Sequence, residues 1–78
     1  MSAEILDFIA KNLVDNPDDV QITSREEGDG QVLLELRVHP DDMGKVIGKR
    51  GRTAKAIRTM VKAAGTREGV NASVEIVE

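Results

Sequence analysis

The apolar positions of this chain recur first at the spacing of a helix and then at the spacing of a strand, and later segments repeat both patterns. Residues 3–14 have apolar side chains three or four positions apart, which predicts a helix. Ser2 is expected to act as its N-cap, and Asn16-Pro17 is expected to end it. The apolar residues at this spacing are Ile5, Phe8, Ile9 and Leu13.

Two predicted strands follow, because apolar and polar residues then alternate with a period of two. The first strand is expected around Val20 and Ile22. The second is expected over residues 32–38, where every second residue is apolar. Gly28-Asp29-Gly30 lies between them and favours a tight turn, so the two strands are predicted to form a hairpin.

The rest of the chain predicts two helices and a third strand. His39-Pro40-Asp41-Asp42 is typical of a helix start, with Pro at the first helical position and two carboxylates near the positive end of the dipole. This short helix is expected to end at Gly48. A third helix is predicted from Gly51 to Gly65, followed by a loop up to Gly69, because glycine can take the left-handed conformation that ends helices. The alternating apolar residues of the last strand are Ala72, Val74 and Ile76.

This order of elements predicts one α+β domain over residues 1–78, with the helices packed on one face of a three-stranded sheet. With no Cys and a single His, the chain lacks the ligands for a zinc site, and we expect no metal and no cofactor. No apolar run approaches the ~18 residues that span a bilayer. The N-terminus also lacks the pattern of a signal peptide, so we expect a cytoplasmic protein without membrane association.

The net charge of -3 hides a strong separation of charge along the chain. Residues 1–42 hold three Lys/Arg and eleven Asp/Glu, whereas residues 43–67 hold eight Lys/Arg and no acidic residue. Such a basic block is commonly a solvated face, but local potential rather than net charge attracts a polyanion. Because the block surrounds a glycine-rich loop, nucleic acid is the first partner to expect.

That loop is Gly48-Lys49-Arg50-Gly51, between the second and third predicted helices. Glycines at its ends allow a sugar-phosphate backbone to approach the peptide groups closely. The loop also leads into a helix N-terminus, whose free N–H groups and dipole favour an anion. A G-x-x-G pattern alone is weak, and the alternative interpretation is a plain turn with exposed cations.

In its surroundings, the loop resembles the signature of a KH domain. The element order is similar to the type II, prokaryotic KH arrangement, in which an apolar-Ile-Gly-x-x-Gly loop joins two helices. The resemblance covers the entire chain, which is similar to the small free-standing KH domains of bacteria. It rests on the segments Val46-Ile47-Gly48-Lys49-Arg50-Gly51-Arg52 and Ala54-Lys55-Ala56-Ile57-Arg58. It implies a groove for about four nucleotides of single-stranded RNA, with the loop clamping the backbone and the bases over an apolar floor.

By position in this motif, the two glycines shape the loop and the two cations between them meet phosphates. Val46 and Ile47 are candidates for the inner wall of the groove, although Ile47 is equally expected in the core. Leu36 and Val38 could form the floor, but the core is the favoured place for both. The RNA-binding residues implied are Val46, Ile47, Gly48, Lys49, Arg50, Gly51, Arg52 and Lys55.

The third predicted helix carries a basic arc and an unusually wide apolar arc on a helical wheel. The basic arc spans roughly 120° and contains Arg52, Lys55, Arg58, Thr59 and Lys62. Packing on a sheet needs an apolar stripe of only ~100°, so the first helix or another chain is expected to cover the surplus. The resemblance implies self-association and pairing with a larger KH protein, and a possible dimer face contains Ala56, Met60, Ala63 and Ala64.

The leading prediction is a non-enzymatic RNA-binding protein, for which the resemblance implies a role as an RNA chaperone or post-transcriptional regulator affecting cell elongation and envelope homeostasis. Phe8 is the only aromatic residue, so phosphate contacts are expected to outweigh base stacking. The alternative prediction is a protein-interaction module that uses the third helix.

Residues 44–50 differ from a P-loop in glycine spacing and lack its Ser/Thr. His39 has no nucleophile in a recognisable relation to it, so no catalytic residue is expected.

Overall fold

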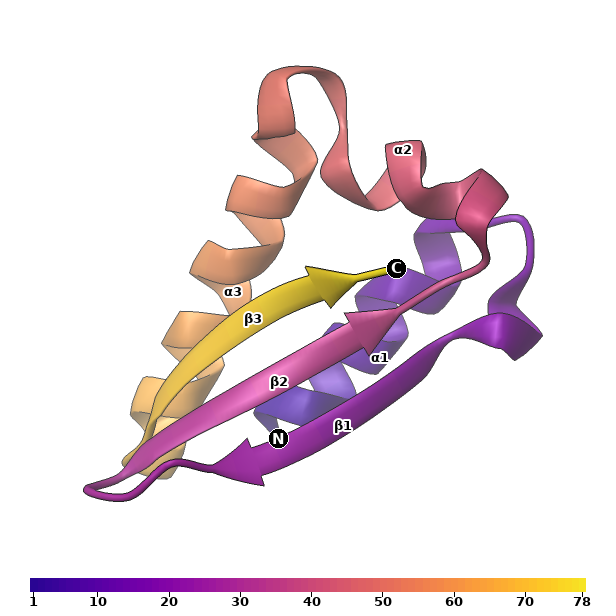
Figure 1. Cartoon of the computed structure of the whole chain (residues 1–78). Helices are drawn as coiled ribbons and strands as arrows, with labels where there is room; N and C mark the ends of the chain where they lie inside the picture. Colours follow the sequence, from indigo (N-terminus) through magenta and orange to yellow (C-terminus); the bar gives the residue numbers. More distant parts are fainter.

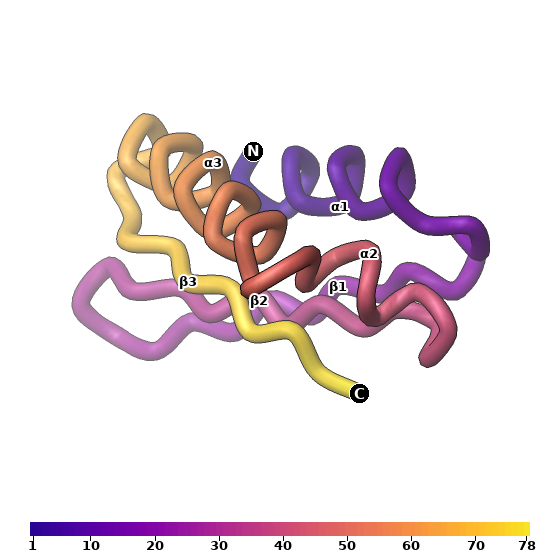
Figure 2. The backbone as a smooth tube through the Cα atoms, turned by 90° about the horizontal axis from the view of Figure 1, so that it is seen from above, coloured from indigo at the N-terminus to yellow at the C-terminus, as the bar shows by residue number.

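The computed structural model describes all 78 residues and places three helices on one face of a three-stranded sheet (Figures 1 and 2). Short 3₁₀ turns at Pro17–Asp19, Pro40–Asp42 and Lys49–Gly51 connect the longer elements. The predicted order and the α+β class are confirmed. The longer elements are α1 (Ser2–Leu13), β1 (Gln21–Glu26), β2 (Gln31–Arg37), α2 (Met43–Ile47), α3 (Arg52–Glu68) and β3 (Asn71–Val77).

The sheet has the order β1-β2-β3, so β2 is its central strand. β1 pairs antiparallel with β2, as the predicted hairpin requires. β3 pairs parallel with β2, which α2 and α3 make possible by crossing over the sheet between the two strands. β3 is therefore an edge strand, and it runs beside α3 (Figure 1).

The core lies between the sheet and the helical layer. Figure 2 shows these two layers of the backbone. Leu36 is fully buried and Val38 is 4% exposed, so both are core residues rather than the floor of an open groove. A fully buried side chain of this kind stabilises the fold by roughly 1.5–3 kcal/mol. The core contains Leu6, Ala10, Val14, Val20, Leu34, Leu36, Val38, Val46, Ile57, Val61, Ala72 and Val74.

α1 differs from the prediction at its start and in the face that it buries. Met1 rather than Ser2 is its N-cap, so the predicted cap was wrong. Ser2 is buried, and its N–H donates to the Glu68 carboxylate at 2.7 Å, so a side chain at the end of α3 caps α1. The buried line of α1 runs through Leu6, whereas Phe8 is 69% exposed.

α3 continues through Gly65 to Glu68, so the predicted end at Gly65 and the predicted loop up to Gly69 were wrong. Gly65 is a packing residue, because a Cβ there would lie 2.8 Å from the Cβ of Ala72 on β3. The left-handed conformation that ends the helix belongs to Gly69, whose φ is 79°. The glycine at position 65 therefore lets α3 lie close against β3.

Gly65→Ala tests this packing role. Alanine favours a helix by ~1 kcal/mol over glycine. We nevertheless expect a net loss of about 1–2 kcal/mol in the free energy of unfolding, because the added methyl group overpacks the contact with β3. Ala72→Gly in the same chain should recover part of the loss, measured by urea denaturation. An unchanged or higher stability of Gly65→Ala alone would contradict the packing role.

A buried carboxylate fixes the start of α2. Asp42 is 1% exposed and accepts hydrogen bonds from the backbone N–H groups of Asp15 and Asn16 at 3.2 and 3.0 Å. The Asn16 side chain donates a third bond at 3.1 Å. Burial alone would raise the pKa of Asp42, but these hydrogen bonds outweigh burial and lower the pKa below its ordinary value. Asp42 thus ties the α1–β1 connection to the helix that precedes the loop.

The lowered pKa of Asp42 predicts a specific loss of stability in acid. A depressed pKa contributes stability that is fully present above the unfolded value of about 4 and is lost as pH falls through the folded value. We expect Asp42→Asn to unfold more readily at neutral pH and to lose less additional stability below about pH 4 than the wild type. Asp41→Asn is the control, because the Asp41 side chain is 86% exposed. Equal acid profiles for Asp42→Asn and the wild type would refute the assignment.

Candidate nucleic-acid interface

The loop between α2 and α3 has a backbone that requires glycine at two positions. Gly48 has φ 76° and ψ 173°, a region populated essentially by glycine alone. A Cβ at Gly48 would also lie 2.2 Å from the Thr53 Oγ1 atom. Gly51 has φ 72° and ψ 15°, but nothing lies within 4 Å of the place of its Cβ. Gly48 is therefore constrained by both conformation and space, and Gly51 by conformation alone.

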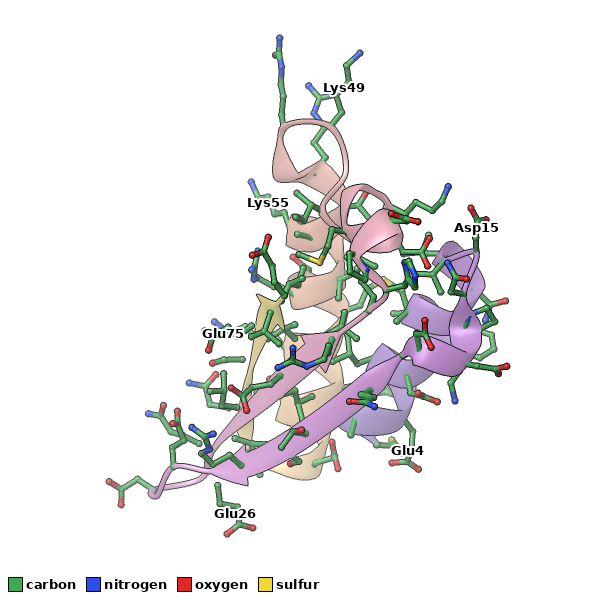
Figure 3. The ribbon with its side chains drawn as sticks, turned by 45° about the vertical axis from the view of Figure 1, so that its right-hand side comes forward. Glu4, Asp15, Glu26, Lys49, Lys55 and Glu75 are labelled. Atoms are coloured by element: carbon green, nitrogen blue, oxygen red, sulfur yellow. The ribbon has the colours of Figure 1, made fainter.

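Three cations, which we call the loop cations, surround this backbone: Lys49, Arg50 and Arg52. They alone line an open hollow of about 260 Å³. Arg50 holds φ 58° and ψ 25°, a left-handed conformation that is uncommon for a residue with a side chain. Lys49 extends away from the domain at the tip of the loop (Figure 3). The hollow is thus open to solvent and lined only by positive charge.

The loop cations also lack carboxylate partners. Lys11, Arg25 and Lys45, which lie outside this region, each form an ion pair, at 3.1, 3.3 and 3.3 Å. No carboxylate lies within 4.0 Å of any cation from the loop to the end of α3, and the positive charge there is not neutralised within the chain. These unpaired cations are Lys49, Arg50, Arg52, Lys55, Arg58, Lys62 and Arg67.

The loop delivers its charge to the N-terminus of α3, a helix of 17 residues. Gly51 is the N-cap and provides no side chain to cap the first turn. The dipole of such a helix favours an anion at this end. The loop and the start of α3 lie together at the tip of the molecule (Figure 1), so the loop cations, the bare backbone and the helix end act at the same place.

The structure separates the two candidates for the groove wall. Val46 is fully buried and belongs to the core, so it offers no surface to a ligand. Ile47 is 38% exposed next to the loop and offers an apolar surface there. Lys55 is exposed on α3 and follows the loop cations along the helix.

One residue of the possible dimer face is buried in the structure. Ala64 is 5% exposed and buried inside the chain, because α3 packs on the sheet along the line that contains Ile57, Val61 and Ala64. The inclusion of Ala64 was therefore wrong. Ala56, Met60 and Ala63 are exposed, and Met60 leaves half of its surface in solvent.

A second hollow, between α3 and β3, has no counterpart in the sequence-based prediction. We call it the α3–β3 hollow; it measures about 340 Å³. Arg58 crosses it, and the Nε–H group donates to the carbonyl of Val74 at 3.2 Å. In the sequence, the only indication of this hollow was that Arg58 and Lys62 lie on the basic arc of the third predicted helix. The hollow is lined by Arg58, Lys62, Asn71, Ala72, Ser73 and Val74.

No group of three or more His, Cys, Asp or Glu side chains is arranged to hold a metal ion. None of the helices combines the length and apolar character needed to cross a membrane.

The fold is similar to part of the Era chain in two solved structures. The structure of Aquifex aeolicus Era bound to GDP and AlF4⁻ superposes with a TM-score of 0.66 at 22% identity. The match covers 96% of this chain and 29% of that one. A complex of Era with MgGDPNP and nucleotides 1506–1542 of 16S ribosomal RNA gives the same TM-score and covers 28% of the Era chain. At this identity the likeness concerns the fold alone.

Curated relatives match over nearly their whole length. The RNA-binding protein KhpA of Clostridium acetobutylicum is 55% identical over 74 residues, which cover 95% of this chain and 97% of the relative. KhpA of Streptomyces coelicolor is 60% identical, and the match covers 86% of this chain and 84% of the relative. KhpA of Bacillus subtilis is 49% identical, and the match covers 96% of this chain and 91% of the relative. The family model described as "KhpA/KhpB, KH domain" matches residues 3–76. The resemblance read from the loop motif is thereby confirmed, and the chain belongs to the KhpA/KhpB family of KH domains.

Proposed function

We propose that this protein binds single-stranded RNA and that the loop of residues 48–51 clamps the phosphate backbone. The relatives at 49–60% identity are named RNA-binding proteins, which supports the class of ligand. The observation that carries the mechanism is the set of unpaired loop cations around two positive-φ glycines at the head of α3. A phosphate there gains charge-assisted hydrogen bonds without displacing an internal ion pair.

In this mechanism the strand lies with its phosphates on the loop cations and then on Lys55. Ile47 gives the bases an apolar contact at the loop end of the groove. The only aromatic residue, Phe8, lies on α1, so base stacking contributes little and phosphate contacts dominate the affinity. We propose a binding protein rather than an enzyme, because the loop offers cations and backbone N–H groups but no general base or nucleophile.

Mapping by NMR tests the mechanism directly. A short single-stranded RNA of mixed sequence is titrated into the ¹⁵N-labelled chain. We expect the amides of residues 48–55 to shift first and most. A blunt-ended RNA duplex with strands of equal length is the comparison, and it should bind more weakly because the groove requires a single strand. Shifts that avoid the loop would refute the clamp.

We further propose that the protein acts as a homodimer or as a heterodimer with a KhpB-like protein in the cytoplasm. A single site with few phosphate contacts is weak, and two loops on one RNA raise the avidity through effective concentration. Exposed apolar side chains on the helical layer support association, above all Phe8 and Met60. In this setting the protein serves as an RNA chaperone or post-transcriptional regulator that influences cell elongation and envelope homeostasis.

The second candidate function is a protein-interaction module, which the exposure of Phe8 and Met60 favours. Met60→Glu separates the two functions. We expect this variant to sediment as a monomer where the wild type sediments as a dimer, and to bind a short RNA with unchanged affinity per chain. Thr59→Glu is the control, since it adds the same charge one position away, on the basic arc. A monomeric wild type at micromolar concentration would count against self-association, although a heteromeric partner would remain open to a pull-down with a KhpB-like protein.

A further inference from the structure

β1 is the second edge strand of the sheet, and its outer edge carries no cover. β1 pairs with β2 without interruption, and the Glu27 N–H group donates to the Gln31 carbonyl at 2.9 Å. Because hydrogen-bonded and non-hydrogen-bonded pairs alternate in an antiparallel ladder, the odd-numbered residues of β1 bond to β2. The backbone groups of Ile22, Ser24 and Glu26 therefore point outward, and no side chain of the protein bonds to them.

The opposite edge of the sheet is partly closed. The Val74 carbonyl on β3 accepts the Arg58 Nε–H group at 3.2 Å. β1 has no such contact. It also has neither a proline nor a bulge, two of the devices that keep an edge strand from pairing with another chain. The edge of β1 is therefore the place where the sheet can accept a fourth strand.

An open hollow of about 340 Å³, which we call the α1–β1 hollow, lies beside this edge. Ile22 faces it from β1, since it lies opposite the buried Leu36 on the helical side of the sheet, and Ser24 follows two positions on. The same two residues thus present unpaired backbone groups at the edge and side chains to the hollow. The hollow is lined by Ala3, Glu4, Asp7, Ile22 and Ser24.

The charge of the α1–β1 hollow determines which strand fits it. Glu4 and Asp7 line it, and no lysine or arginine does. Glu4 contacts the N-terminal ammonium group, and Asp7 pairs with Lys11 at 3.1 Å. The two carboxylates are 81% and 41% exposed, so these pairs contribute little and exchange readily for others. Carboxylates repel phosphates, and Figure 3 shows Glu4 at the end of the molecule opposite Lys49 of the loop. The hollow thus favours a basic protein segment over RNA.

We propose that β1 accepts an extended segment of a partner protein, rich in lysine or arginine, as a fourth strand of the sheet. The backbone of the segment bonds to the free N–H and C=O groups of Ile22 and Ser24, and every second side chain enters the α1–β1 hollow. A lysine or arginine there lays its aliphatic stem on Ile22 and brings its charge to Glu4 and Asp7. The site is separate from the loop, so RNA and the segment bind at the same time.

A capped peptide of alternating threonine and lysine, as long as β1, tests the proposal when it is titrated into the ¹⁵N-labelled full chain. We expect the amides of Ile22, Ser24 and Glu26 to shift and to exchange with deuterium more slowly, because their N–H groups gain acceptors. The amides of residues 48–51 should stay unchanged. The same peptide with glutamate in place of lysine should bind at least about tenfold more weakly.

Two kinds of variant separate backbone pairing from attraction by charge. Ser24→Pro removes an outward N–H group without removing a bond to β2, and it should abolish the protection of the edge, while unchanged β2 amides check the fold. Glu4→Gln together with Asp7→Asn should weaken binding of the lysine peptide about fivefold. Asp18→Asn together with Asp19→Asn removes the same charge outside the hollow and should change binding by less than about twofold.

Equal binding of the lysine and glutamate peptides, shifts confined to residues outside β1, or no shift at millimolar peptide would overturn the proposal. Equal losses in the two charge variants, or an unchanged response of Ser24→Pro, would do the same. Protection of the edge amides that rises with protein concentration alone would also overturn it, because a second copy of the chain would then be the occupant.

Discussion

Reversing the charge of two loop residues, Lys49→Asp together with Arg50→Asp, is expected to reduce the affinity for single-stranded RNA by roughly a hundredfold or more. Each charge-assisted hydrogen bond to a phosphate contributes about 1.5 kcal/mol or more, and two such losses already exceed a factor of a hundred in Kd. The loop cations have no ion pair to lose within the chain, so the fold should stay intact. Fluorescence anisotropy with a labelled RNA of mixed sequence gives the affinity, and circular dichroism checks the fold.

A charge-matched variant makes this result specific to the loop. Lys11→Asp together with Arg25→Asp changes the net charge equally, at two exposed positions on α1 and β1. We expect this variant to bind RNA with an affinity within a few-fold of the wild type, because the local potential at the loop rather than the total charge guides the phosphates. Equal losses in both double variants would show that only the net charge matters, and the clamp would then lose its support.

Gly48→Ala is expected to have the largest effect on stability of any single change in the loop. Its backbone lies in a region that costs a residue with a side chain about 1–3 kcal/mol. The new Cβ would in addition clash with the Thr53 side chain and backbone at 2.2–2.9 Å. Together these effects predict a loss of about 3 kcal/mol in the free energy of unfolding, or a displaced loop that no longer binds RNA.

Gly51→Ala is the matched comparison, because this glycine has the left-handed φ but no neighbour within 4 Å of its Cβ position. We expect a loss of only about 1 kcal/mol, since alanine pays the conformational cost but meets no atom. Urea denaturation of both variants gives the difference. Equal losses would mean that the contact between Gly48 and Thr53 has no energetic weight, and the description of the loop would need revision.

The sequence predicted the hairpin, the short helix before Gly48 and the loop because their determinants are local. Alternation of apolar residues, proline at a helix start and glycine in a turn act over a few positions. The same reasoning failed at Gly65, where a glycine that stops a helix cannot be told from one that allows close packing. Only the position of Ala72 on β3 distinguishes the two roles.

The features that the sequence did not predict depend on residues far apart in the chain. Asp42 anchors α2 through Asp15 and Asn16, whose backbone N–H groups have no residue-type signal. The α3–β3 hollow exists because β3 is an edge strand beside α3, a consequence of the parallel pairing with β2. The burial of Ala64 and the exposure of Phe8 likewise follow from how the helices lie on the sheet.

The salt dependence of RNA affinity tests most directly whether Lys49 and Arg50 contact phosphates. For single strands, the slope of log K against log salt concentration is about -0.7 for each phosphate neutralised. The wild type and the charge-neutral variant Lys49→Gln/Arg50→Gln are compared between about 50 and 200 mM salt. If both cations meet phosphates, the slope of the variant should be shallower by roughly 1.4. Equal slopes would contradict the phosphate clamp, whatever the difference in affinity.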